Sequence, residues 1–332
     1  MRILSGAQVA ELVTTADLIE PIAAAMVEVS RGNVEMPLRS MVKLPGSNFM
    51  GIMAGHLGAP AGYGVPAGHG GVPAGHGVKV LSLFPENPAH GRSSHAGLFL
   101  LFDGATGLPV LCMDAAVLTA IRTAASTAVA SRVLARPDSR VLAILGLGEQ
   151  AHSHIAAMRA VHPIERIIAW GRDRAKLDAF ARENKVEVAA SAAEAVAGAD
   201  IIVTATPARE PFLSAAMLQP GQHVNAVGAS VAFMQEMTAD IVAATRFVTD
   251  YRASLEPQAA EVIAARRDGL IGPDHDIPEI GEIIAGTKPG RRSDREITVY
   301  RSLGISAQDL AAAHAILSRV EAAGIGTVVD MA

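Results

Sequence analysis

The sequence predicts an α/β protein, in which a doubly wound parallel-sheet domain is joined to an α+β domain that is discontinuous in the chain. Three observations lead to this fold class. An apolar run at 141–145 precedes a glycine-rich turn and a helical pattern, strands and short helices then alternate, and the first ~115 residues are mostly strands. The length of 332 residues is sufficient for two domains.

The composition narrows the possible partners. Half of the residues are hydrophobic but only 4% are aromatic, so the cores are expected to be aliphatic. A net charge of −5 gives no general attraction to nucleic acid or to an anionic membrane. Cys112 is the one cysteine, which excludes an intrachain disulfide and fits a reducing compartment, and no apolar run reaches the ~18 residues of a membrane span. We expect a cytoplasmic protein that acts on a small molecule.

The first domain is predicted to hold two basic side chains within strands. Residues 1–4 are predicted to form a strand and residues up to about 30 a helix, followed by strands at 36–44, 49–54 and 78–84 and a hairpin of 97–102 with 108–113. Arg39 falls in the second strand, where it could equally be a solvated charge. Lys79 lies among apolar residues, so it must reach water, pair with an acid or contact a ligand.

Residues 58–77 are dominated by glycine and proline and repeat the sequence Val-Pro-Ala-Gly-His-Gly. Such a segment is predicted to be a loop. Its His69 and His76 have no third ligand at a recognisable spacing, so we predict no metal site.

An alanine-rich helix is predicted from residue 117 to 134, with Arg122 near its start. A buried arginine at this place is costly unless it meets an anion. The dinucleotide fingerprint follows. The segment Gly146-Leu-Gly-Glu-Gln-Ala151 has the Gly-x-Gly-x-x-Ala pattern between a strand and a helix, where Gly146 permits a tight turn and Gly148 lets a pyrophosphate approach the backbone. We therefore predict a Rossmann domain with a dinucleotide cofactor.

The end of the second strand of this domain indicates which cofactor is used. Gly171 stands where an acid would bind the ribose 2′-hydroxyl, and Arg172 and Arg174 follow it. This favours NADPH, although Asp173 could still serve NADH. Further strands are predicted at 201–206, 223–227 and 244–248, a last strand ends near residue 300, and a helix at 308–323 returns to the first domain. The predicted domains are 1–116 with 305–332, and 117–304.

At this point the chain resembles the ornithine cyclodeaminase/mu-crystallin family over nearly its whole length. The matching pieces occur in the family's order and include Met36-Pro-Leu-Arg39, Val78-Lys-Val80, Leu101-Phe-Asp-Gly-Ala-Thr-Gly107, Leu118-Thr-Ala-Ile-Arg122, Gly146-Leu-Gly-Glu-Gln150, Asn225-Ala-Val-Gly228 and Ser302-Leu-Gly-Ile305. The resemblance implies a substrate-binding first domain that forms a homodimer and a second domain that binds NAD(P)(H).

The resemblance also implies the site residues. Arg39, Lys79 and Arg122 match residues that hold an amino-acid carboxylate and line the reacting carbon, and Leu303 matches a substrate contact. The predicted cofactor-binding set is Ser94, Arg122, Gly146, Gly148, Glu149, Gln150, Gly171, Arg172, Arg174, Thr206, Val227 and Ser302. Physically, two arginines can bind a carboxylate through forked hydrogen bonds, and Lys79 can polarise or protonate an imine nitrogen.

One departure from the family pattern bears on the reaction. Ornithine cyclodeaminases carry an aspartate two residues after the glycine that matches Gly228, whereas this chain has Ser230. A hydroxyl is a poor general base without a partner, so cyclisation is disfavoured. The resemblance instead implies reduction of a small cyclic ketimine carboxylate, with Δ1-pyrroline-2-carboxylate favoured and the piperideine homologue possible, and with Lys79 and Ser230 catalytic. The alternatives are ornithine cyclodeaminase, an alanine-type amino-acid dehydrogenase, and an NADPH-holding binding protein similar to mu-crystallin.

Overall fold

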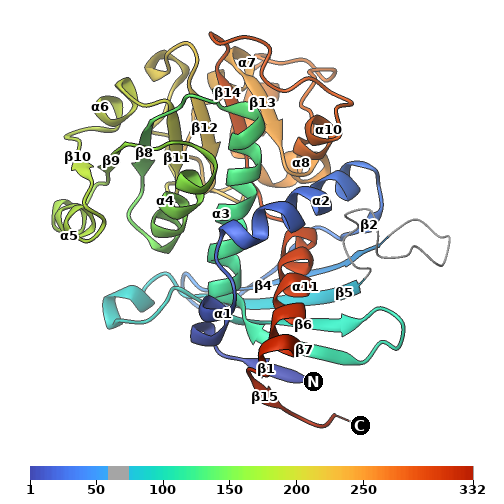
Figure 1. The fold of residues 1–332 in the computed structure, drawn as a ribbon. Helices are drawn as coiled ribbons and strands as arrows, with labels where there is room; N and C mark the ends of the chain where they lie inside the picture. Colours follow the sequence, from blue (N-terminus) through green and yellow to red (C-terminus); the bar gives the residue numbers. More distant parts are fainter. Residues whose placement is uncertain (59–74, 332) are drawn as a thin grey trace. The chain divides into compact units, whose positions relative to one another are not determined.

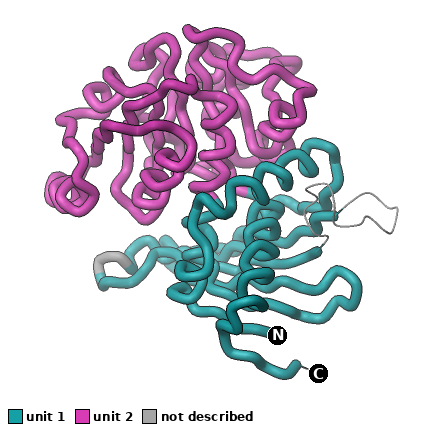
Figure 2. Tube along the Cα trace, viewed as in Figure 1, with its two compact units in different colours: residues 1–122, 305–332 teal, residues 123–304 magenta. Residues whose placement is uncertain are grey.

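The computed structural model describes residues 1–58 and 75–331 (Figure 1). The chain divides into two compact units, which are coloured separately in Figure 2. One unit comprises Met1–Arg122 with Ile305–Ala332, and the other comprises Thr123–Gly304. The division falls inside helix α3 (Ala115–Leu134), a few residues after the position predicted from the sequence.

The first unit is a mostly antiparallel sheet with helices on one face. Within the described residues its strands are β1 (Arg2–Leu4), β2 (Val34–Glu35), β3 (Ser40–Lys43), β4 (Phe49–Leu57), β5 (Gly75–Leu83), β6 (His95–Asp103), β7 (Pro109–Asp114) and β15 (Thr327–Val328). They follow the order β15-β1-β7-β6-β5-β4-β2, with β3 paired to β4. The helices are α1 (Gly6–Leu12), η1 (Ala16–Leu18), α2 (Ile19–Ser30), η2 (Asn87–His90) and α11 (Ser306–Ala323).

Alternation along the central strands decides which side chains face the helices. Helix α11 packs on β4, β5 and α2, as Figure 1 shows for its course along the sheet. Lys79 on β5 pairs with Phe99 on β6, and both side chains are buried on this helical side. Their neighbours Val80 and Leu98 also pair, but they are 37% and 53% exposed on the opposite face. Lys79 is therefore in the interior because its position in the alternation puts its side chain on the face of β5 that the helices cover.

Two predictions for this unit are wrong. Residues 1–30 form separate helices α1 and α2 rather than one, because Val13 is extended and ends α1. The strand predicted at 36–44 begins only at Ser40, so Arg39 lies in the connection before β3. Strand β15, which pairs antiparallel with β1, was not predicted.

The prediction of a loop at 58–77 is also wrong at its C-terminal end, because β5 already begins at Gly75. Glycine is required there by close packing rather than by a turn. A Cβ at Gly75 would lie 2.4 Å from Nε2 of His314 on α11, and one at Gly77 would lie 2.6 Å from the carbonyl oxygen of Leu100. His76, between them, stacks on Phe102 at 5.2 Å, whereas His69 lies outside the described residues.

The second unit is a parallel sheet, as the sequence predicted. Among the described residues its strands are β8 (Val141–Leu145), β9 (Arg166–Trp170), β10 (Glu187–Val188), β11 (Ile201–Thr204), β12 (His223–Ala226), β13 (Arg246–Thr249) and β14 (Thr298–Arg301). Their order is β10-β9-β8-β11-β12-β14-β13, and every pairing is parallel. The order reverses direction between β8 and β11, which is where ligands bind in doubly wound sheets.

Helices connect these strands and enclose an aliphatic core of residues such as Leu145, Ile202, Val224 and Val299. Besides the C-terminal part of α3, the helices are α4 (Glu149–Val161), α5 (Arg174–Asn184), α6 (Ala192–Ala197), η3 (Ala215–Met217), α7 (Asp240–Ala244), η4 (Arg252–Ser254), α8 (Leu255–Gln258), α9 (Ala260–Arg267) and α10 (Ile280–Ile284). In the described parts of the chain no helix is both long and apolar enough to cross a membrane.

Candidate active site

Lys79 lies in a buried ion pair in the first unit. Its ammonium nitrogen is 2.8 Å from Oδ2 and 3.0 Å from Oδ1 of Asp309, and it donates a longer hydrogen bond of 3.3 Å to Oγ1 of Thr119. Lys79 is 1% exposed and Asp309 is fully buried. The pair thus joins the middle of β5 to the first turn of α11.

Arg122 on α3 contacts the same acid. Its Nε donates to Oδ1 of Asp309 at 2.8 Å, and its Nη1 donates to Oε1 of Gln308 at 2.6 Å. The residue is 4% exposed. Its second terminal nitrogen, Nη2, makes no hydrogen bond to any residue that the structure describes.

The electrostatic balance of this cluster is positive. Burial is the main cause that lowers the pKa of Lys79 to about 8; Asp309 opposes this shift, and Arg122 and Arg39 contribute to it. Arg39 therefore acts on Lys79 through space. One carboxylate, that of Asp309, pairs with both Lys79 and Arg122, and this excess of positive charge favours binding of an additional carboxylate.

Asp309 is the residue of this cluster that the sequence analysis missed. An aspartate in the first turn of a helix is usually explained by the helix dipole and solvent. The signal that could have identified it is its position among Ala and Leu residues on a helix expected to pack on the first domain. A charge buried on a helix requires a partner, and Lys79 and Arg122 were the available candidates.

Ser94, the other predicted site residue of this unit, precedes β6 and is partly buried. Its hydroxyl lies 2.9 Å from Nδ1 of His95. Among the described residues it makes no hydrogen bond to Lys79 or Arg122, but its partner His95 lies close enough to Lys79 for that charge to lower the pKa of His95.

The glycine turn of the second unit fits a dinucleotide. Gly146 follows β8 with φ of +128°, and a Cβ there would lie 2.4 Å from the carbonyl oxygen of Ala205. Gly148 caps α4, and a Cβ there would meet nothing within 4 Å, so the space over the helix N-terminus is open. Gln150 places its buried Oε1 at this turn without a hydrogen bond from the described residues, and Glu149 is exposed beside it. Free N–H groups beside open space suit a pyrophosphate.

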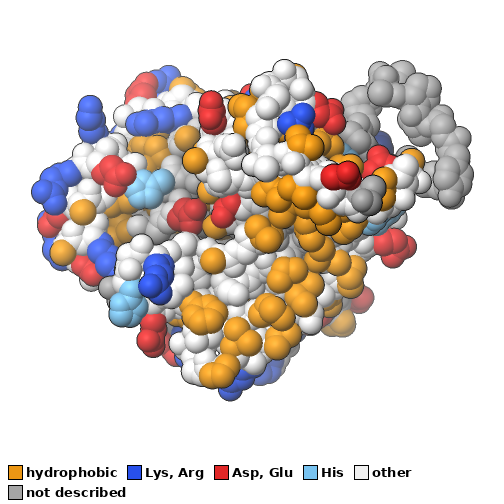
Figure 3. Space-filling model, turned by 90° about the horizontal axis from the view of Figure 1, so that it is seen from below, with side chains coloured by type: hydrophobic (Ala, Val, Ile, Leu, Met, Phe, Trp, Pro, Cys, Tyr) orange, Lys and Arg blue, Asp and Glu red, His pale blue; other side chains and the backbone are white. Residues whose placement is uncertain are grey.

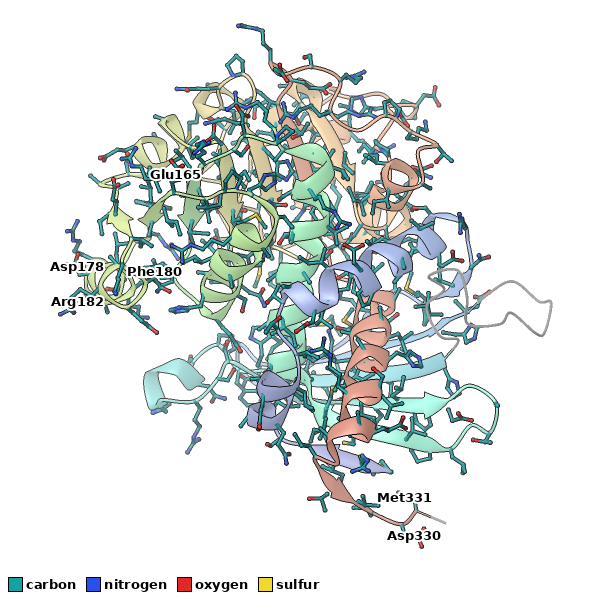
Figure 4. All side chains as sticks on the ribbon, viewed as in Figure 1. Glu165, Asp178, Phe180, Arg182, Asp330 and Met331 are labelled. Atoms are coloured by element: carbon teal, nitrogen blue, oxygen red, sulfur yellow. The ribbon has the colours of Figure 1, made fainter. Side chains whose placement is uncertain are left out.

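The end of β9 carries the arginines predicted to select the cofactor. A Cβ at Gly171 would collide with the side chain of Leu147, so no acid fits there without displacing Leu147. Arg172 and Arg174 are exposed, and Arg174 pairs at 3.0 Å with Asp178, which Figure 4 labels on α5. Asp173 accepts a hydrogen bond from the N–H of Lys176 as the cap of α5.

Two buried carboxylates hold the loops at the carboxyl ends of the other strands. Glu236 accepts hydrogen bonds from N and Oγ1 of Thr206 (2.7 and 2.8 Å), from Oγ1 of Thr204 (2.9 Å) and from N of Gly228 (2.8 Å). Burial raises its pKa, and the donors from Thr206 and Thr204 oppose the shift. It therefore joins the loop after β11 to the loop after β12.

Asp250, which directly follows β13, holds the loop after β14. It accepts hydrogen bonds from the N–H groups of Leu303 (2.9 Å) and Gly304 (2.6 Å). Ser302 in this loop is 2% exposed, and its Oγ has no partner among the described residues. Val227 is buried and Ser230 partly buried after β12. The predicted residues of this unit thus all follow the carboxyl ends of parallel strands, and Glu236 and Asp250 are the supporting residues that sequence reasoning missed.

Comparison with known proteins identifies the family of this chain. The description "Ornithine cyclodeaminase/mu-crystallin family" matches residues 1–324. The chain belongs to the ornithine cyclodeaminase/mu-crystallin family. It is 35% identical over 260 residues to a Δ1-pyrroline-2-carboxylate reductase of Bacillus cereus, covering 76% of this chain and 80% of the relative. It is 32% identical to the ketimine reductase mu-crystallin of Mus musculus, covering 89% and 90%.

A solved structure of the family is similar over the whole chain. The Thermococcus litoralis Δ1-pyrroline-2-carboxylate reductase, in complex with NADH and L-proline, has a TM-score of 0.90 and 29% identity, covering 99% of this chain and 100% of that one. The family and the fold predicted from the sequence are both confirmed. No group of three His, Cys, Asp or Glu residues that could hold a metal ion occurs among the described residues.

Proposed function

We propose that this chain reduces a small cyclic ketimine carboxylate with NADPH, and that the favoured reaction converts Δ1-pyrroline-2-carboxylate to L-proline. The observation that carries the proposal is the buried, positively charged cluster of Lys79, Arg122 and Asp309, with Arg39 close enough to act on Lys79. Its net charge calls for an anionic substrate. The names of the Bacillus cereus and Thermococcus litoralis relatives support the imine and the ring.

Arg39 and the N–H groups on Nη2 of Arg122 hold the substrate carboxylate. Charge-assisted hydrogen bonds from guanidinium groups fix both the position and the plane of a carboxylate. Lys79 then faces the imine nitrogen, where its ammonium group donates a hydrogen bond and delivers a proton as the double bond is reduced. A pKa of about 8 suits this role, because the group is charged at neutral pH yet transfers its proton readily.

The cofactor is assigned to the unit 123–304. When bound, the nicotinamide cofactor supplies the hydride that reduces the imine carbon. The turn from Gly146 to Gln150 holds its pyrophosphate, and Thr206, Val227 and Ser302 line the loops beyond. Gly171 stands in place of an acid and is followed by the exposed Arg172, which supports NADPH over NADH. NADH is expected to serve as cofactor less well. Ser230 hydrogen-bonds to substrate or water but supplies no base for cyclisation.

The unit 1–122 with 305–332 is assigned to substrate binding and to a homodimer. Exposed hydrophobic side chains form a band on the face shown in Figure 3. On the side of the sheet opposite α11, the paired residues Ile52, Val80 and Leu98 are all apolar, and Ile3 on β1 is 38% exposed. An apolar sheet face of this kind is covered by a partner in stable proteins, here a second copy of the chain. Leu98→Glu should lower the mass measured by light scattering to that of one chain.

A substrate panel tests the reaction. Purified protein is given Δ1-pyrroline-2-carboxylate, the piperideine homologue, ornithine and alanine with either cofactor, in the reaction direction that each requires. We expect NADPH oxidation with the cyclic ketimines and a much smaller rate with NADH. Absence of NADPH oxidation with either ketimine at millimolar concentration would refute the proposal. Arg122→Ala should lower kcat/KM by an amount on the order of 2–5 kcal/mol in activation free energy.

A further inference from the structure

Asp309 connects two different elements through one side chain. Its Oδ1 lies 3.0 Å from Nζ of Lys79 on β5 and 2.8 Å from Nε of Arg122 on α3. Its Oδ2 lies 2.8 Å from the same Nζ, so the carboxylate is shared by both cations. Asp309 is fully buried, and it comes from α11, some 187 residues after Arg122 in the chain.

We infer that Asp309 is a positioning residue of the reductase, which keeps Lys79 charged as the proton donor and holds Arg122 in the orientation that receives the substrate carboxylate. This inference rests on the proposed function for the roles of Lys79 and Arg122. Asp309 itself is not expected to contact the substrate, because it is fully buried and each of its oxygens lies within 3.0 Å of Lys79 or Arg122.

The charge on Lys79 depends on this acid. The groups that act on Lys79 are Asp309 on α11, Arg122 and Thr119 on α3, and Arg39 before β3, while His95 on β6 lies close enough to respond to its charge. Burial and both arginines favour the neutral amine, and Asp309 is the one described group among them that favours the ammonium form. A neutral amine has no proton to give to an imine nitrogen, so loss of Asp309 should remove the donor.

The orientation of Arg122 depends on the same turn of helix. Asp309 accepts from Nε and the adjacent Gln308 accepts from Nη1, so two consecutive residues of α11 fix the guanidinium plane. Because the guanidinium is planar and is held at both Nε and Nη1, the direction of the N–H groups on Nη2 is determined by α11. The fixed plane therefore pre-orients the substrate carboxylate.

The deciding experiment compares the pH dependence of kcat/KM for Asp309→Asn with that of the wild-type protein. The wild type should lose activity on the alkaline side near pH 8, the pKa of Lys79. In D309N this limb should move to lower pH by about 1–3 pH units, with activity partly recovered in acid. The control is Asp17→Asn, which breaks an exposed ion pair of 2.6 Å to Arg319 on the same helix and should leave the limb unchanged.

A second readout needs no turnover. The side-chain signal of Lys79, identified by its loss in Lys79→Met, is titrated by NMR in the wild-type and D309N proteins. Its titration midpoint should fall by the same 1–3 pH units. If the wild type proves inactive on cyclic ketimines and the midpoint still falls, the proposed function fails while the dependence of Lys79 on Asp309 stands. An unchanged midpoint, or an unchanged alkaline limb, would overturn the inference.

Should D309N fail to fold, Asp309→Glu decides the question. This variant keeps the negative charge but moves both oxygens by one methylene, so the alkaline limb should stay near its wild-type position. The displaced Lys79 and Arg122 should nevertheless lower kcat by about 10- to 100-fold. Wild-type kcat in D309E would contradict a positioning role.

Discussion

Replacing Glu236 by glutamine tests whether the two loops beside the cofactor turn are held by one buried carboxylate. Both oxygens of Glu236 accept from backbone N–H groups: Oε1 from Thr206, and Oε2 from Gly228 and, at 3.3 Å, from Ala229. A glutamine must direct its NH₂ group at one of these donors, whichever way the amide is turned. The hydroxyl donors on Thr204 and Thr206 can rotate to accept, whereas a backbone N–H cannot.

The expected magnitude follows from this geometry. One orphaned, buried N–H costs about 1–3 kcal/mol. Burial already disfavours the charged carboxylate of Glu236, as its raised pKa shows, and part of that penalty disappears in the neutral variant. We therefore expect a loss of about 1–2 kcal/mol in the free energy of unfolding, which corresponds to a fall in Tm of about 2–8 °C for a domain of this size.

Calorimetry and cofactor titration provide the measurements. If the loops shift enough to weaken cofactor contacts by about 1.4 kcal/mol, the Kd for NADPH measured by fluorescence should rise about tenfold. Glu210→Gln, an exposed acid of the same unit, is the matched control and should change neither quantity. If E236Q melts and binds NADPH as E210Q does, the loops are not held by Glu236 and the reasoning fails.

Three further predictions concern the same unit. Gly146→Ala should lower Tm and abolish NADPH binding, because of its φ of +128° and the backbone oxygen that its Cβ would meet, whereas Gly148→Ala should keep Tm and weaken only binding. Arg172→Ala should raise KM for NADPH and leave KM for NADH unchanged; equal effects on both would contradict the assignment. His154 and His223 are buried and neutral, with pKa values lowered by burial to about 4 and about 3. Their full contribution to stability is therefore present above about pH 6.5, the ordinary histidine pKa, and is lost as pH falls, by about 2 kcal/mol for each histidine between pH 6.5 and 5. Urea unfolding at both pH values tests this, and a flat stability profile would refute it.

Local sequence patterns were enough to predict the fold of the unit Thr123–Gly304. The glycine turn, the small residue at position 151 and the strand–helix alternation are set by steric requirements between neighbours in the chain, so they could be recognised without the fold. The resemblance named Arg39, Lys79 and Arg122 as candidate site residues for a related reason, since each of them lies in a short sequence motif and these motifs occur in the family's order. The errors in the first unit came where packing overrides local preference, as with Gly75 and Gly77, which the sequence assigned to a loop and the structure places in β5 beneath α11.

The sequence by itself determined the parallel-sheet unit, its glycine turn after β8, and two basic residues that must find an anion. Only the tertiary structure decided which anion they find, because Asp309 comes from the other end of the chain and reaches Lys79 and Arg122 only when α11 packs on β5. Glu236 likewise reaches Gly228 only across two strand ends. Electrostatic interactions between buried groups depend on distance and burial, which sequence spacing does not encode.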